Sequence, residues 1–143
     1  MSLLIGKQQA VALEQAARSV EKLKSFGQWC QQKQSLPAAT RKTIEVLLAK
    51  VETKNCQTAD LKLSKLTELT IANCNDKISD IRPLASFTKL TSLSLGGQSI
   101  SDLRPLSGLT NLTSLNLNSN QISDVRPLAG SIALTQLDLT SIN

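Results

Sequence analysis

The C-terminal half of the chain repeats itself with a period of 22 residues. Three units, residues 66–89, 90–111 and 112–133, align with one another, and a fourth, 134–143, begins in the same way. Each of the four opens with Leu-x-x-Leu-x-Leu (Ile71 ends the first), and the first three continue to an isoleucine, a Ser-Asp pair and Arg-Pro-Leu. The first unit has 24 residues because two extra residues precede Ile78. A unit this short cannot enclose its own leucines, so they become buried only when units stack.

Within each unit the local pattern predicts a strand followed by a tight return. Apolar and polar residues alternate in the opening segment, as in a short half-buried strand, and successive strands then pair as a parallel sheet. One proline per unit fits the return leg because it fixes φ and lacks a backbone donor. One aspartate, three residues before each proline, can cap a turn or a short 3₁₀ segment. These residues are Pro83, Pro105, Pro127, Asp80, Asp102 and Asp124.

The segment before the repeats predicts α-helices. Its first apolar stripe has spacings of three and four residues, typical of an amphipathic helix that Gly27 would loosen at its end. A second helix is expected to start near Pro37 and to end near residues 53–55. Because a repeat array exposes an apolar edge at its first unit, we expect residues 1–62, with two main helices, to cap repeats at 63–143. The inward residues are predicted to be Leu13, Ala16, Val20, Leu23 and Phe26, then Ile44, Leu47, Leu48 and Val51.

The repeat pattern resembles the internalin-like class of leucine-rich repeats, known from bacterial surface and secreted proteins and from some intracellular regulators. The resemblance lies in LxxLxLxxN followed by IsDxxPL and covers residues 63–143. It implies an α/β solenoid: a short right-handed array of about 3.5 repeats, with a parallel sheet on the concave side. The pattern Trp29, Cys30, Leu36, Pro37 and Cys56 is similar to the helical cap of certain secreted bacterial leucine-rich repeat proteins.

The chain departs from that family at the position of its ladder asparagine. The asparagine is present as Asn120, but the equivalent positions hold Gln98 and Cys74, or Asn75 if the insertion shifts the register, and Ile142 in the last unit. Bonding from these side chains to the loop backbone is therefore predicted to be weaker than in a regular array.

The three cysteines leave two interpretations open. Cys30 follows the first predicted helix and Cys56 the second, so a helical hairpin could bring them together as a disulfide worth about 3.5 kcal/mol. The alternative is two unrelated reduced thiols. An oxidised pair would favour an extracytoplasmic or cell-surface location, and a reduced pair the cytoplasm. Cys74 is interpreted as a buried core thiol.

The composition argues against an enzyme. With no histidine, Ser-His and Cys-His arrangements are excluded, and three cysteines leave a tetrahedral zinc site short of ligands. Gly96-Gly97 is isolated and forms no phosphate loop, and the repeated aspartates are interpreted as turn caps. We expect no catalytic residue, cofactor or metal. No apolar run is long enough to span a bilayer.

The positive charge is concentrated at the N-terminal side. Residues 1–65 carry eleven Lys or Arg and five Asp or Glu, whereas residues 66–143 carry five and six. This basic segment either favours an acidic partner or is a solvated helical face. Nucleic acid is not expected, because aromatic residues make up 2% of the chain and do not interleave with the basic ones. The column Arg82, Arg104 and Arg126 could likewise contact an acidic partner or pair with the adjacent aspartates.

The candidate binding site is the outward side of the predicted strands. It is small, polar and nearly uncharged, so it is either a hydrogen-bonding recognition face for a protein or peptide or an ordinary solvated sheet face. Its candidate residues are Glu68, Thr70, Ser92, Ser94, Ser114, Asn116, Asn118, Gln136 and Asp138.

These observations favour a protein-protein interaction module that binds through the concave strand face. Two alternatives remain. The chain stops just after a strand, so the open edge at residues 137–139 could drive self-assembly into a homo-oligomer, or a longer protein was truncated. The third alternative is a regulatory subunit of an enzyme, for which the sequence offers no distinguishing feature.

Overall fold

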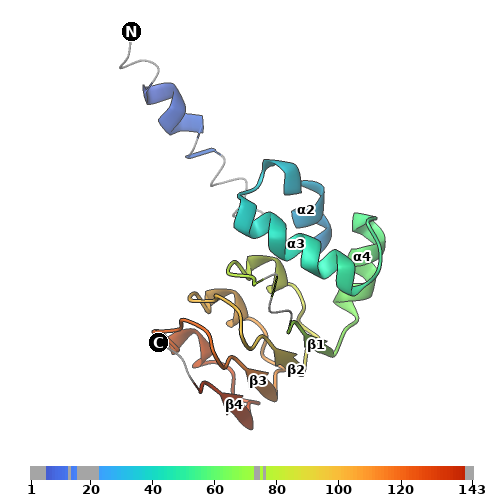
Figure 1. The fold of residues 1–143 in the computed structure, drawn as a ribbon, viewed down its shortest axis with the longest axis vertical. Helices are drawn as coiled ribbons and strands as arrows, with labels where there is room; N and C mark the ends of the chain where they lie inside the picture. Colours follow the sequence, from blue (N-terminus) through green and yellow to red (C-terminus); the bar gives the residue numbers. More distant parts are fainter. Residues whose placement is uncertain (1–5, 13, 16–22, 73–74, 76, 141–143) are drawn as a thin grey trace.

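The computed structural model describes residues 6–12, 14–15, 23–72, 75 and 77–140. It shows a helical segment followed by stacked repeats, each of which forms one turn of a solenoid, here called a coil (Figure 1). Each coil contributes one short strand: β1 Glu68–Thr70, β2 Ser92–Ser94, β3 Ser114–Asn116 and β4 Gln136–Asp138. The four strands form one parallel sheet in the order β1-β2-β3-β4. The predicted α/β solenoid is confirmed.

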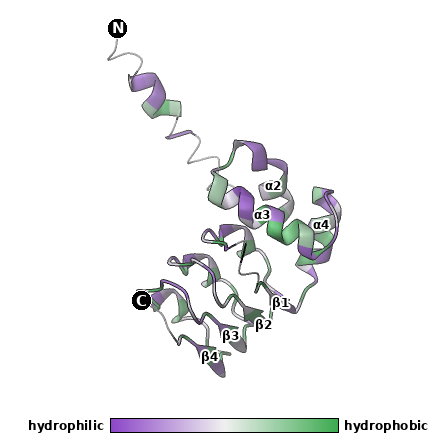
Figure 2. Ribbon diagram, viewed as in Figure 1, coloured by the Kyte–Doolittle hydropathy of each residue, from purple (hydrophilic) through white to green (hydrophobic). Residues whose placement is uncertain are grey.

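One leucine at the centre of each strand sets the register of the sheet. Leu69, Leu93, Leu115 and Leu137 lie opposite one another along the stack. Leu115 is 1% exposed, whereas Leu137 in the outermost strand is 45% exposed. The aliphatic core therefore runs through the whole array and opens to solvent at β4. Hydrophobic and hydrophilic residues alternate around each coil (Figure 2).

The return legs are short 3₁₀ turns capped by aspartate, as predicted. They are η2 Arg82–Leu84, η3 Arg104–Leu106 and η4 Arg126–Leu128. In each, Oδ1 of the aspartate two residues earlier accepts a hydrogen bond from the arginine backbone N–H, at 3.0–3.1 Å. The arginine side chain then donates to the same carboxylate, so one aspartate holds both the backbone and the side chain of its turn.

Gln98 performs the role that sequence analysis assigned to asparagine. Nδ2 of Asn120 donates to the carbonyl of Leu95 at 2.8 Å, and Oδ1 accepts from the amide of Ile100 at 3.0 Å, which joins two coils. The Gln98 amide makes the same pair of bonds to the preceding coil, at 3.0 and 2.9 Å. The prediction of weaker bonding at Gln98 is wrong, because its longer side chain reaches both backbone groups. Cys74 and Ile142 lie outside the described residues.

The helices α2 Phe26–Gln31, α3 Ala38–Lys50 and α4 Cys56–Ser64 precede the sheet, with the turn η1 Lys33–Ser35 between the first two. Each start has a local cause. Ser25 and Gln28 form a reciprocal capping box at α2, and Asn55 accepts from the Thr58 amide at α4. Pro37 occupies the N-cap of α3 without a side-chain hydrogen bond, and its ring fixes φ where the helix starts. Residues 6–12 and 14–15 are also helical and are exposed.

The predicted first helix is corrected at its C-terminal end. Phe26 begins a new helix, because Ser25 provides its N-cap. Gly27 does not loosen a helix end but lies buried in the first turn of α2, where an added Cβ would come within 3.0 Å of the Asp60 carboxylate on α4. Glycine thus allows the two helices to approach closely. Leu13, Ala16 and Val20 lie outside the described residues.

The second predicted helix is found, and α4 was not predicted. Ile44, Leu47 and Leu48 of α3 are buried as expected, and Val51 is half-buried just after the helix ends at Lys50. α4 was missed because it is short and only two of its residues are buried, Ala59 and Leu63. Its apolar periodicity is consequently weak.

The helices pack directly on the first coil. The ring centroids of Phe26 and Phe87 are 6.1 Å apart. Buried Thr40 donates to the Asp80 carboxylate at 2.5 Å, and buried Thr43 donates to the Asp80 backbone oxygen at 2.6 Å. The helical segment and the repeats therefore share one continuous core.

A disulfide joins Cys30 at the end of α2 to Cys56 at the start of α4, with their Cα atoms 5.5 Å apart. Of the two interpretations of these cysteines, a disulfide or two reduced thiols, the structure contains the disulfide. The bridge joins α2 and α4, the helices that precede and follow α3 in the sequence.

Candidate functional site

The candidate residues on the strands align in two rows across the sheet. The strand register places Glu68, Ser92, Ser114 and Gln136 in one row, and Thr70, Ser94, Asn116 and Asp138 in the next. All eight are exposed or half-buried, while the leucines between the rows of β1 to β3 are buried. With Asn118, just after β3, they form a surface that we call the strand face.

Two members of the strand face also shape the loops beyond the strands. Oδ1 of Asn116 accepts from the Asn118 amide at 2.9 Å, and Oδ1 of Asp138 accepts from the amide of Thr140 at 2.9 Å and from its hydroxyl at 2.8 Å. The two bonds from Thr140, of which the backbone bond has the larger effect, lower the pKa of Asp138 and keep its carboxylate charged. Asn116 and Asp138 therefore have a structural role in addition to any contact with a partner.

A column of threonines at the strand starts is committed to the fold. The hydroxyls of Thr91, Thr113 and Thr135 each donate to the backbone oxygen of the threonine one coil earlier, at 3.1–3.2 Å. Because their hydroxyl protons are already donated between coils, these threonines have fewer hydrogen-bond donors left for a partner than the neighbouring serines.

The loop after β2 is shaped by glycine. A Cβ at Gly96 would lie 2.1 Å from Oδ1 of Asn118, so glycine is required for the Asn118 side chain to occupy its place on the strand face. Gly97 has φ of +72°, and Ser119, one coil later, has φ of 56°. Both residues are in the left-handed region, which glycine adopts without steric cost.

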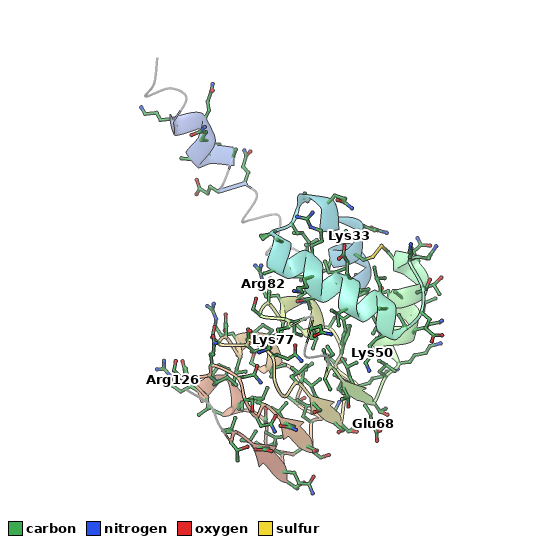
Figure 3. All side chains as sticks on the ribbon, in the orientation of Figure 1. Lys33, Lys50, Glu68, Lys77, Arg82 and Arg126 are labelled. Carbon is green, nitrogen blue, oxygen red and sulfur yellow. A yellow bond between two sulfur atoms is a disulfide. The ribbon has the colours of Figure 1, made fainter. Side chains whose placement is uncertain are left out.

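The arginine column lies away from the strand face, on the 3₁₀ turns. The guanidinium groups of Arg82, Arg104 and Arg126 lie 2.7, 2.7 and 2.9 Å from the carboxylates of the aspartates two residues earlier. Figure 3 labels the first and last of these arginines. Of the two interpretations in the sequence analysis, the structure shows the pairing with aspartate. The Arg104–Asp102 and Arg126–Asp124 pairs are exposed, and exposed pairs contribute little to stability individually.

The aspartates of this column have lowered pKa values. Burial raises the pKa of Asp80, but hydrogen bonds from Arg82 and Thr40 outweigh it and hold the pKa below 3.8. Hydrogen bonds from the side chain and then the backbone of the paired arginine lower the pKa of Asp102, and those from Arg126 lower that of Asp124 to about 2.

Acidification is therefore expected to destabilise the array below about pH 4. A carboxylate whose pKa is lowered in the folded state stabilises the fold fully when the pH is above its unfolded-state pKa of 3.8. That contribution is lost as the pH falls through the folded-state pKa, which is about 2 for Asp124. The urea concentration at the unfolding midpoint should decrease as the pH is lowered from about 5 to about 2. The double variant Asp102→Asn, Asp124→Asn should show a shallower fall, and an equally steep fall would contradict this assignment.

A second surface feature was not predicted from the sequence. One face of α3 and the residues just after β1 border an open hollow of about 550 Å³, which we call the α3 groove. Its lining is Lys42, Glu45, Val46, Ala49, Lys50, Ile71 and Ala72. The helical residues have the i, i+4, i+8 spacing of one helix face, but the sequence does not reveal that this face meets the sheet.

Among residues 6–12, 14–15, 23–72, 75 and 77–140, no three His, Cys, Asp or Glu side chains cluster as metal ligands would. None of the helices found over the same ranges has the length and apolar character needed to cross a bilayer.

Comparison with known proteins agrees with this architecture. The family described as leucine-rich repeats (2 copies) matches residues 88–130. An internalin, InlF, from Listeria monocytogenes aligns with 29% sequence identity and a TM-score of 0.62, covering 71% of this chain and 30% of that one. Internalin C2 (InlC2) of the same organism aligns with 38% identity and a TM-score of 0.48, covering 55% and 35%. No curated protein sequence matches.

The aligned region spans about a third of the length of either internalin. The likeness to InlF extends beyond the two matched repeats, since it covers most of this chain. The parallel sheet, the repeated 3₁₀ turns and the preceding helices agree with it. This chain therefore has an internalin-like leucine-rich repeat fold, with α-helices capping the first of its repeats.

Proposed function

We propose that the protein is an interaction module that binds a protein or peptide through the strand face. Leucine-rich repeat arrays typically act as binding scaffolds rather than enzymes, because stacking creates an extended surface of regularly spaced side chains. The observation that carries the proposal is the pair of rows, in which eight outward residues from four strands lie in register on one side of the sheet.

The chemistry of these rows favours close polar contact. Ser92, Ser94 and Ser114 have short side chains, so a partner can approach the sheet closely and little rotamer freedom is lost on binding. The strand face itself holds no Trp, Tyr or Arg, the residue types that dominate binding energy at most interfaces. The anchoring side chains must consequently come from the partner.

Substituting two central serines is expected to abolish capture of the partner. The variant Ser94→Arg, Ser114→Arg places bulky charges in adjacent rows of the strand face and leaves the loop cap made by Asn116 intact. Proteins retained on immobilised wild-type chain should be depleted about tenfold or more on this variant, as measured by quantitative mass spectrometry.

A matched control separates the site from the added charge. Thr88 and Thr110 are exposed in the turns after η2 and η3, outside the strands, so Thr88→Arg, Thr110→Arg, which adds the same two charges, should retain the wild-type set of captured proteins. The circular dichroism spectrum of all variants should match that of the wild type. Undiminished capture by the serine variant, with its fold intact, would show that the strand face is not the binding site.

The disulfide supports a location outside the cytoplasm. Structural disulfides persist in oxidising compartments and are rare where thiols are kept reduced. The Cys30–Cys56 bridge is accordingly the feature that favours an extracytoplasmic or cell-surface setting. A thiol titration of the protein isolated from its native compartment tests this, and two more reactive thiols than expected would argue for the cytoplasm.

Self-association through β4 is the second candidate function. β4 is the outer strand of the sheet, and Leu137 is 45% exposed there, so a second copy could add a strand and cover the leucine. Sedimentation over a wide concentration range should then show a dimer that Leu137→Asp dissociates. A strictly monomeric wild type over that range would rule this candidate out.

A further inference from the structure

The last coil leaves core positions of the repeat exposed to solvent. Val125 and Leu137 are 44% and 45% exposed, whereas Leu103 and Leu115, which occupy the same positions one coil earlier, are each 1% exposed. In this chain the surface beyond β4 is therefore an apolar patch of the kind that marks an interaction site. We call this surface the open end, and it consists of Val125, Leu134, Leu137 and Leu139.

The opposite end of the array is closed by the helical segment (Figure 1). Leu69 occupies the position of Leu137 in the first coil but is only 4% exposed. Phe26 of α2 packs there against Phe87 of the first coil. A second copy that stacked head to tail would consequently meet helices and not an apolar coil. Two copies can cover each other's repeat core only by joining their open ends, which makes the contact symmetric.

The backbone of β4 adds hydrogen-bonding capacity to the open end. Backbone groups of Gln136, Asp138 and Thr140 point toward β3 and the loop after it, to which they are hydrogen-bonded. Because the backbone groups of successive residues alternate between the two edges of a strand, the N–H and C=O of Leu137 point outward. In an antiparallel pair of β4 strands, Leu137 lies opposite its own copy and exchanges two N–H···O bonds with it.

The polar side chains on either side of Leu137 are complementary in this register. Gln136 of each copy then lies opposite Asp138 of the other, and an exposed carboxamide can donate to a carboxylate. The bonds from the Thr140 amide and hydroxyl both end on Oδ1 of Asp138, and among the described residues no other donor reaches its Oδ2. A pair centred on Asp138 would instead bring two carboxylates together, which is unfavourable.

We propose that two copies of this chain join through their open ends, with the β4 strands antiparallel and centred on Leu137. The inference rests on self-association through β4 and adds its symmetry, its register and its consequence. A two-fold axis perpendicular to the sheet relates the copies, so both strand faces lie on the same side of one continuous sheet. The dimer is closed, because the helices cover the other end of each copy. A partner with two binding segments can then engage both strand faces at once.

Paired cysteine variants test the register directly. Chains carrying Gln136→Cys and Asp138→Cys, each with Cys74→Ala to remove the third thiol, are mixed under mild oxidation. In the proposed register the two new thiols face each other while the second Gln136–Asp138 contact of the dimer stays intact. The mixture should form a crosslinked dimer, and either chain alone should form about tenfold less.

Two failures of this experiment have different meanings. Crosslinks that form as readily in either chain alone would overturn the register and leave self-association standing. A wild-type chain that sediments as a monomer at every concentration would overturn self-association itself, and the proposal with it.

Matched charge variants separate the contact from a general effect of charge. Gln136→Glu puts a carboxylate opposite Asp138 of the second copy and should weaken the dimer about tenfold, whereas Gln136→Lys should tighten it. Ser92→Glu adds the same charge to the same row, two strands from β4, and should change the dimer dissociation constant less than about twofold. Sedimentation equilibrium measures each constant, and circular dichroism checks each fold. Equal effects of Gln136→Glu and Ser92→Glu would overturn the proposal.

Discussion

Leu115→Ala is expected to lower the free energy of unfolding by about 3 kcal/mol. Leu115 is 1% exposed at the centre of β3, between Leu93 and Leu137 of the neighbouring coils. Removing its side chain deletes buried methyl groups and leaves a cavity that short, closely stacked coils cannot collapse to fill. Urea denaturation followed by circular dichroism measures the loss.

Leu137→Ala is the matched control, because it makes the same chemical change at the same position of the repeat. Leu137 is 45% exposed, so less apolar surface is lost from the core and the expected change is below about 1 kcal/mol. Equal destabilisation by the two variants would contradict the conclusion that the core is closed at β3 and open at β4.

Removal of the disulfide is expected to lower the free energy of unfolding by about 3.5 kcal/mol. Cys30 and Cys56 are 26 residues apart in sequence, and the bridge restricts the unfolded chain by closing that loop. The variant Cys30→Ala, Cys56→Ala should show a lower urea midpoint than the oxidised wild type. Because α2 and α4 both contribute to the core, the loss should extend to the whole helical segment.

A reductant distinguishes the crosslink from the loss of packing at the two positions. Cys30 is buried, so its replacement also removes core contacts. Dithiothreitol should shift the wild type most of the way to the midpoint of the double variant and leave the variant itself unchanged. If reduction does not move the wild-type midpoint, the bridge does not stabilise the fold.

Most of the repeat architecture could be predicted because each of its causes is local or recurs at a fixed interval. The leucine spacing predicted the strands, the aspartates predicted the capped turns, and the period of 22 residues required the coils to stack in register. The prediction of weaker bonding at Gln98 was wrong because it compared residue types and did not consider the length of the glutamine side chain, which reaches the backbone of the preceding coil.

The helical segment was predicted less completely because its helices are held by contacts distant in sequence. α4 buries only Ala59 and Leu63, and its place is set by Gly27 of α2 and by the disulfide. The strand-face residues remain a prediction as a binding site, although their arrangement in two rows follows from the repeat.

The sequence by itself determined that leucines must be sheltered by stacking, which coil residues face outward, and where each coil turns. These properties depend on side-chain periodicity and on bonds within a few residues. Only the tertiary structure decided that Thr40 and Thr43 bond to Asp80 and that α3 meets the end of β1 to form the α3 groove. Those arrangements join residues about 20 to 40 positions apart, and no repeating pattern specifies the geometry with which two such surfaces pack.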